Sequence, residues 1–187
     1  MIRRLLQTAL PLAVTLGLSG CTTASHMDPQ ARFIAALQKE IDNRAVARHV
    51  VPALAERHSG SDQGRFWSGY TALEIQQAPR YIAIAERHGL APSKLKTRIK
   101  GDISLLFSWL LPQRFVRTLA SATHSYADEL RAISVPPQPD DAQFRLYMIE
   151  QEAVQVEALA QAAEGRYSDA AQALEAFVKK LQTDQVD

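Results

Sequence analysis

The chain has 187 residues, 47% of them apolar and 22% charged, and 21 Lys and Arg against 20 Asp and Glu give a formal net charge of +1. This near balance argues against a nucleic-acid partner, because binding to phosphates needs a concentrated basic surface. The single cysteine, Cys21, excludes a disulfide within the chain.

Residues 1–20 have the pattern of a secretory signal. Arg3 and Arg4 make a basic start, a largely apolar stretch covers residues 5–18, and small residues precede Cys21. The apolar stretch is too short for an ordinary membrane span, so we expect the segment to be a signal peptide that is removed. Loss of its two arginines would leave 19 basic against 20 acidic residues, a net charge of −1.

The order Leu18-Ser19-Gly20-Cys21 resembles the lipobox of bacterial lipoproteins, in which the cysteine is acylated and becomes the new N-terminus. The resemblance implies that Cys21 is the lipidation site, with palmitate among its acyl chains, and that residues 21–28 form a short tether. Thr22 stands where proteobacterial lipoproteins retained in the inner membrane usually have aspartate. The resemblance therefore implies an outer-membrane lipoprotein facing the periplasm. An ordinary secretory signal with an incidental cysteine is the alternative.

After the tether, the signals are helical. There is no sustained period-2 alternation and no Asn-Gly or Asp-Gly hairpin turn. Asp28-Pro29 predicts one helix start, and Gly89 followed by Leu90 predicts one helix end. The expected helices cover residues 29–58, 61–89, 93–133 with a break at Pro112, 140–164 and 168–182, and residues 184–187 are expected to be a disordered tail.

Short loops between long helices predict an all-α fold in which neighbours are antiparallel. The first four helices are expected to form a four-helix bundle with the fifth as an additional C-terminal helix, in one domain over residues 29–183. Pro52, Pro79 and Pro112 predict kinks, which can open a groove or merely wrap helices around a core. The apolar run at residues 105–111 is too short to span a membrane, so it is interpreted as a core helix.

A candidate buried polar site centres on Glu74. Tyr70, Glu74 and Gln77 lie three or four residues apart, which places a carboxylate on an aromatic helix face. Because a buried carboxylate needs a partner, we expect a tyrosine or an arginine to hold it. Glu150 is expected to face the site from helix 140–164, in the inward row that also holds Tyr147, Val154 and Glu157.

Carboxylates on facing helices resemble the ferritin-like bundles, which hold two metal ions in this way. The paired Glu-x-x-His motifs of that family are missing, because Gln77 follows Glu74 by three residues and Ala153 follows Glu150 by three. We therefore predict no catalytic residue, no metal ligand and no cofactor. A ferritin-like enzyme or metal-binding protein, using Glu74 and Glu150 with Glu40 and His124, stays open as the alternative.

Four cations open the helix that begins at Ser93. Cations at a helix N-terminus oppose the helix dipole, so helix stability does not explain them. On a domain tethered to a membrane they could contact anionic head groups or a partner. Pairing with acids of helix 140–164 (Glu150, Glu152, Glu157 and Glu164) is the alternative. The cations are Lys94, Lys96, Arg98 and Lys100.

Taken alone, the sequence favours a lipid-anchored periplasmic protein that binds another protein of the cell envelope without catalysis. An assembly accessory and an immunity-type lipoprotein that blocks a toxin both fit this description. The expected partners are the membrane, through the N-terminal lipid, and an envelope protein, but not nucleic acid.

Overall fold

The computed structural model describes residues 28–184, with the backbone alone at Lys96, and every regular element in this part of the chain is an α-helix. The predicted signal peptide, Cys21 and residues 22–27 of the tether lie outside the described residues, as do residues 185–187 of the tail. The helices are α1 (Pro29–Arg57), α2 (Asp62–Arg87), α3 (Lys94–Leu110), α4 (Pro112–Ala132), α5 (Pro139–Ala163) and α6 (Tyr167–Thr183).

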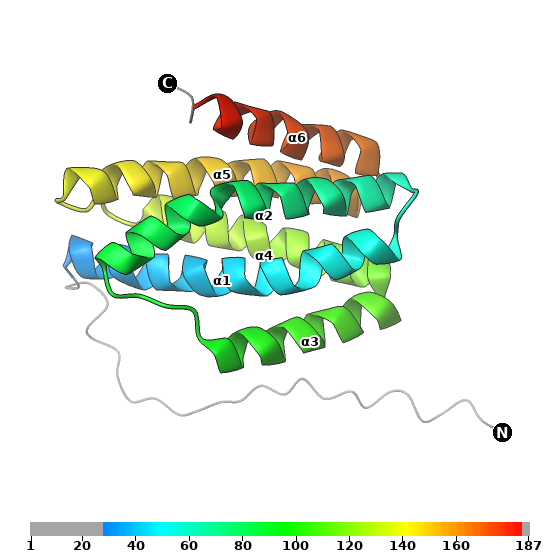
Figure 1. Ribbon diagram of the computed structural model, residues 1–187, viewed down its shortest axis with the longest axis horizontal. Coiled ribbons are helices and arrows are strands. Elements are labelled where there is room, and N and C mark those ends of the chain that lie inside the picture. Colours follow the sequence, from blue (N-terminus) through cyan, green and yellow to red (C-terminus); the bar gives the residue numbers. More distant parts are fainter. Residues whose placement is uncertain (1–27, 185–187) are drawn as a thin grey trace.

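The helices form an antiparallel bundle, which confirms the predicted fold class (Figure 1). α1, α2, α4 and α5 make up its body, with α1 packed on α2 and α4 packed on α5. The additional C-terminal helix, α6, packs on α2 and α5. α3 lies on the opposite side, against α1 and α4 (Figure 1).

Local capping makes the loops between these helices short. The hydroxyl of Ser61 accepts a hydrogen bond from the backbone N–H of Gly64 at 3.1 Å, which closes the first turn of α2. Gly89 has φ of +65°, and the N–H of Leu90 then donates to the carbonyl of Ala85 at 2.8 Å. This left-handed C-cap ends α2 as predicted, because glycine adopts that conformation without strain.

The three prolines behave differently. α1 and α2 continue through Pro52 and Pro79, and the ribbon of α2 changes direction in its second half (Figure 1). The predicted break at Pro112 is confirmed: it divides the expected helix 93–133 into two separate helices, α3 and α4. Leu111 between them has φ −140° and ψ 63°, because a residue before proline avoids the helical region. α4, rather than one long helix, is therefore the fourth helix of the bundle.

Two apolar clusters fill the bundle. One joins α1, α2, α4, α5 and α6 around side chains such as Trp67, Leu159 and Leu174. The other, nearer the start of α1, includes Phe33, Leu37 and other buried side chains of α1, α2, α4 and α5. Between the members of the two clusters lie buried polar residues: Arg44 in α1, Glu74 and Gln77 in α2, and Gln151, Glu152 and Gln155 in α5.

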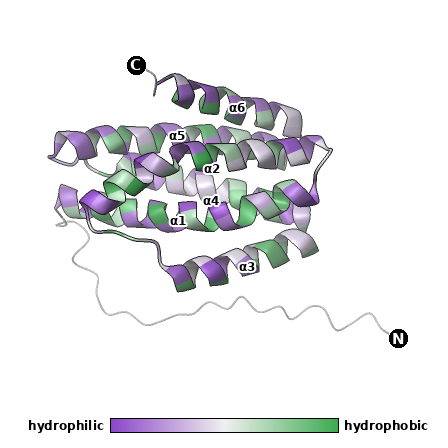
Figure 2. Cartoon of the chain, in the orientation of Figure 1, coloured by the Kyte–Doolittle hydropathy of each residue, from purple (hydrophilic) through white to green (hydrophobic). Residues whose placement is uncertain are grey.

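α3 is not the predicted core helix. Leu106, Trp109 and Leu110 of the apolar run are exposed, while Leu105 and Phe107 are partly buried against the core. Among the residues of α3 that the structure describes in full, Gly101 and Ser108 alone are fully buried. The ribbon coloured by hydropathy shows α3 becoming more apolar toward its C-terminal end (Figure 2). The interpretation was wrong because Pro112 separates the run from the bundle. None of the helices within residues 28–184 combines the length and apolar character that crossing a membrane requires.

We predict that Gly64→Ala destabilises the protein by about 1–3 kcal/mol, because an added methyl group overpacks a fixed backbone. A Cβ at this position would lie 2.1 Å from the carbonyl oxygen of His58, in the α1–α2 turn. Gly69→Ala is the matched control, since its Cβ would meet Leu174 at an ordinary 3.6 Å. Urea denaturation measures both variants, and equal free energies of unfolding for the two would contradict the predicted clash.

Candidate functional site

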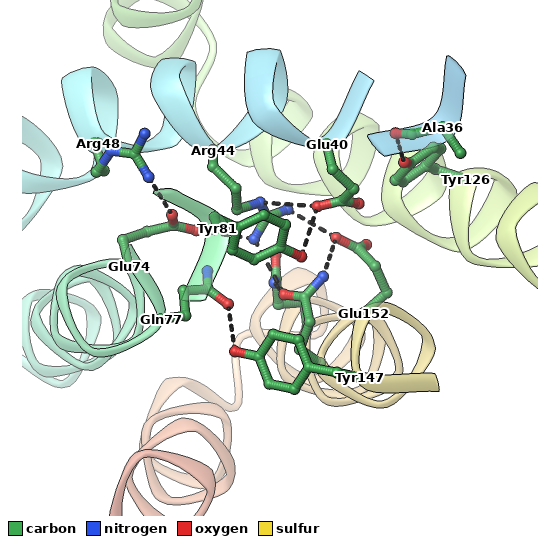
Figure 3. A network of polar contacts seen from close by, with 12 residues as sticks. Ala36, Glu40, Arg44, Arg48, Glu74, Gln77, Tyr81, Tyr126, Tyr147 and Glu152 are labelled. Atoms are coloured by element: carbon green, nitrogen blue, oxygen red, sulfur yellow. Dashed lines mark hydrogen bonds and ion pairs between the residues drawn. The ribbon is translucent and has the colours of Figure 1, made fainter. Parts of the chain in front are cut away.

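The centre of the bundle holds one arginine among three carboxylates. Arg44 of α1 is buried and binds Glu74 of α2 through Nη1 at 2.9 Å and Glu152 of α5 through Nη2 at 2.7 Å. Its Nε lies 3.3 Å from Glu40 Oε2, one turn earlier in α1. We call Glu40, Arg44, Glu74 and Glu152 the buried charge cluster, and Figure 3 shows its side chains converging from three helices.

Neutral polar groups surround this cluster and supply further hydrogen bonds, although one carboxylate oxygen each of Glu40 and Glu74 is buried without a hydrogen bond. Tyr81 donates its hydroxyl to Glu40 at 3.1 Å, and the amide of Gln151 donates to Glu152 at 2.9 Å. A second chain of bonds runs from the Tyr70 hydroxyl to Gln155 and from the Gln155 amide to Gln151. These bonds lower the cost of burying charge, since each donor satisfies an oxygen that has lost water.

The cluster holds more negative than positive groups. Arg48, which is exposed, adds a second cation whose Nη1 lies 3.9 Å from Glu74 Oε2. Burial raises the pKa of the Glu152 carboxyl well above its ordinary value, and the neighbouring Glu40 raises it further. Burial also raises the pKa of Glu74, although Arg44 opposes that shift. Glu152 is therefore the carboxyl whose protonation most readily balances the two arginines.

The same carboxylates keep Arg44 charged. Burial alone would favour its neutral form, but Glu74, Glu40 and Glu152 raise the pKa of Arg44 well above its ordinary value. The cluster thus behaves as one interdependent unit in which removing any member changes the charge state of the others.

Three of the four residues predicted for the polar site are in place. Glu74 is buried and paired with an arginine, as expected. Gln77 and Tyr70 are buried on the same helix, where Gln77 accepts a hydrogen bond from Tyr147 at 3.4 Å. The prediction that Glu150 faces this site is wrong, because Glu150 is exposed and pairs with Lys180 of α6.

The residues named for the ferritin-like alternative divide in the same way. Glu40 is buried within the cluster, whereas His124 is exposed and lies 3.3 Å from Asp128 on the surface of α4. Within residues 28–184, no three side chains of His, Cys, Asp and Glu are placed to hold a metal ion together. Arg44 occupies the space between the carboxylates of α1, α2 and α5.

Sequence reasoning missed the central cation and one of its acids. Arg44 follows Glu40 by four residues among apolar positions of α1, and this i, i+4 pair on a buried face was the available signal. Glu152 was missed because the inward row of α5 was placed on Glu150 and Glu157. The buried row of α5 instead passes through Met148, Gln151, Glu152, Gln155 and Leu159.

The basic residues at the start of α3 lie on the surface. Lys94, Arg98 and Lys100 are exposed. These three described side chains form no ion pair with the acids of helix 140–164, of which Glu150 binds Lys180, Glu152 binds Arg44 and Glu164 binds Arg166. Lys96 lies on α3, and its side chain is outside the described part of the structure.

A groove runs along the seam between α1 and α4. Two adjoining pockets of about 300 and 460 Å³ share Lys39, Tyr126 and Glu129. The first reaches inward to Tyr70, Arg44 and Glu152, so one edge of the buried charge cluster lines it. We call this feature the α1–α4 groove, and its remaining lining residues are Arg32, Ala35, Ala36, Asn43, Ala47, Ala122, Thr123, Ala132 and Ile133.

Small side chains make this groove. Alanines from both helices line it, while Lys39 and Glu129 form an ion pair across the seam. A groove of this kind can admit a polypeptide segment, with Glu152 and Arg44 as polar groups at its floor.

Comparison with protein-family models, curated proteins and solved structures found no match to this chain.

We predict that Arg44→Met lowers the free energy of unfolding by about 3–5 kcal/mol, because three buried carboxylates lose their counter-charge. Glu74→Gln keeps the shape of the side chain and should change stability by no more than about 1–2 kcal/mol. Urea denaturation compares the two, with Arg65→Met as the control. Arg65 forms an exposed pair with Glu175 at 2.6 Å, so its loss should have little effect. If Arg44→Met lowered the free energy of unfolding no more than Arg65→Met does, the buried charge cluster would not be what holds the helices of the bundle in place.

A second prediction concerns pH. Because the folded-state pKa of Glu152 lies above its unfolded value, its contribution to stability is complete below the unfolded pKa and is lost as pH rises through the folded pKa. Stability should therefore fall between about pH 5 and pH 9, and Glu152→Gln should make that fall shallower. Glu74 contributes with the same sign, so some slope should remain. An unchanged slope in Glu152→Gln would contradict the assignment.

Proposed function

We propose that this chain is a lipid-anchored module of the bacterial cell envelope that binds another envelope protein without catalysing a reaction. The lipobox-like order Leu18-Ser19-Gly20-Cys21 is the observation that carries the proposal. It supports acylation of Cys21 and, with Thr22 after it, a place on the outer membrane facing the periplasm. An assembly accessory and an immunity-type lipoprotein both remain within this proposal.

The α1–α4 groove supports the binding role. Its alanine lining allows a partner backbone to approach closely, and the Lys39–Glu129 pair at its edge can exchange for contacts with the partner. The buried charge cluster beneath it keeps α1 and α5 in fixed positions, so the α1 wall and the floor of the groove are in place before a partner arrives. A preformed wall loses less entropy on binding, which favours a scaffold role.

The ferritin-like alternative has less support. Carboxylates from α1, α2 and α5 do converge, but the guanidinium of Arg44 holds them together. A metal ion at this point would have to compete with that cation. Elemental analysis of the purified protein tests the alternative directly, and metal that is present in near-stoichiometric amount and lost in Glu74→Gln would favour it over the binding role.

The anchor predicts the behaviour of Cys21→Ser. This variant should not incorporate labelled palmitate and should retain its signal segment, because the acyl acceptor is absent. Thr22→Asp is the matched control: it should still take up label but move from the outer-membrane to the inner-membrane fraction. Label on Cys21→Ser would overturn the proposed anchor, and an unmoved Thr22→Asp would overturn the outer-membrane assignment alone.

The binding role is tested by photo-crosslinking in intact cells. A photoreactive residue at Ala35, an exposed position in the α1–α4 groove, should give one discrete adduct with an envelope protein. The same residue at Leu146, an exposed position on α5 outside the groove, serves as the control. Equal adducts at both positions, or none at Ala35, would contradict the groove as the binding surface.

A further inference from the structure

α3 carries a row of apolar side chains on its exposed surface. Their spacing of four, four, three and four residues places them on one helix face. All are between 51% and 71% exposed, and Trp109 at 66% lies one turn from Leu106. We call these residues with Trp109 the α3 stripe, and they are Leu95, Ile99, Ile103, Leu106 and Leu110.

The side of α3 that faces the bundle mixes small and polar residues with two apolar side chains, Leu105 and Phe107, which pack partly buried against the core. Gly101 packs against the ring of His49, where an added Cβ would come within 2.3 Å. Ser108 accepts a hydrogen bond from Arg57 at 3.1 Å. α3 thus has apolar side chains on both sides, and those that face away from the bundle lie uncovered on its surface.

Basic side chains border this stripe. On a helix with 100° between residues, Lys94 and Arg98 fall on one side of the stripe and Lys100 on the other, and all three are exposed. The one acid of α3, Asp102, falls among the stripe residues on the same count, and its Oδ1 lies 3.2 Å from Nε2 of His49 of α1, which draws it toward the bundle. A stripe of Leu, Ile and Trp bordered by Lys and Arg is the pattern of a helix that lies in the surface of an anionic bilayer.

We propose that the α3 stripe lies in the surface of an anionic lipid bilayer, with its apolar side chains at the acyl boundary and its basic side chains on the head groups. This inference rests on the proposed anchor at Cys21. It adds a second contact with the same leaflet, which orients the domain rather than leaving it to rotate on its tether.

The length of the tether permits both contacts at once. The axes of packed helices lie about 8–10 Å apart, and α1 packs on α3. If α3 lies in the bilayer surface, α1 therefore lies about 8–10 Å farther from the bilayer than α3 does. Residues 22–28 can extend to about 25 Å, which is enough to join the start of α1 to an acylated Cys21 in the leaflet. The anchor also keeps α3 at a high effective concentration near the lipid.

The experiment uses the acylated full-length protein, placed in vesicles of phosphatidylglycerol and phosphatidylcholine whose acyl chains carry bromine. Two tryptophans report on position, because Trp67 is 1% exposed and Trp109 is in the stripe. We expect the brominated lipid to quench Trp109 and the vesicle to shield it from acrylamide, and Trp109→Phe should abolish the quenching. Vesicles of phosphatidylcholine alone should quench Trp109 less.

The test variant combines Ile99→Glu with Ile103→Glu, two exposed positions at which charge should not disturb folding. It should lose the quenching yet still float with the vesicles through its lipid. Ile75→Glu is the matched control, since Ile75 of α2 is 67% exposed and outside the stripe. It should behave as the wild type does.

Flotation and quenching separate the two proposals. Flotation without quenching would overturn the membrane contact of α3 and leave the anchor standing, whereas failure to float would overturn the anchor. Quenching that survives in the double variant would also overturn the role of the stripe. Two further results would overturn the membrane contact, because the stripe would then be covered by protein. One is shielding of Trp109 from acrylamide only after an envelope protein is added. The other is shielding that increases with the concentration of this protein when no vesicles are present.

Discussion

The burial of Arg44 is the constraint on which the arrangement of the bundle depends. A guanidinium away from water needs carboxylates with good geometry, and here Glu74 and Glu152 supply them from two other helices. Sliding either helix by one turn, about 5.4 Å, would separate the pair and leave uncompensated charge in the core. Apolar contacts tolerate such shifts more readily. We therefore attribute the register of α1, α2 and α5 to this cluster more than to the two apolar clusters beside it.

The position of the groove follows from the same constraint. α4 supplies none of the cluster's charged members, and Tyr126 meets α1 through a 3.4 Å hydrogen bond to the carbonyl of Ala36. The remaining ion pair between these helices, Lys39 with Glu129, is exposed and so contributes little to stability. The α1–α4 seam is therefore held less firmly than the joints between α1, α2 and α5. A surface that must accept a partner is best placed at such a seam, where opening it leaves the charge cluster intact.

How far the sequence predicts this structure depends on the range of each interaction. Helix starts and ends such as Ser61 and Gly89 were predictable because capping is local. The burial of Glu74 followed from its helical spacing, but its partner Arg44 lies 30 residues away on another helix, and periodicity does not identify such pairs. Glu150 and Glu152 are two residues apart on α5, but Glu150 is exposed and Glu152 is buried. Placing the inward face of α5 two residues too early therefore predicted the exposed acid in place of the buried one.

α3 shows what composition alone cannot decide. The run ending at Leu111 is apolar enough for a core, but after the break at Pro112 it is α4 that enters the bundle, and α3 lies beside it. Only part of the run, Leu105 and Phe107, packs against the core. Because α3 and α6 lie on opposite sides of the bundle (Figure 1), a bilayer under α3 would leave α6 facing away from the membrane. The domain would then present a defined side to the periplasm. For a protein on a short tether, this orientation determines which surfaces a partner can reach, and an apolar helix face directed outward is the structural feature that can set it.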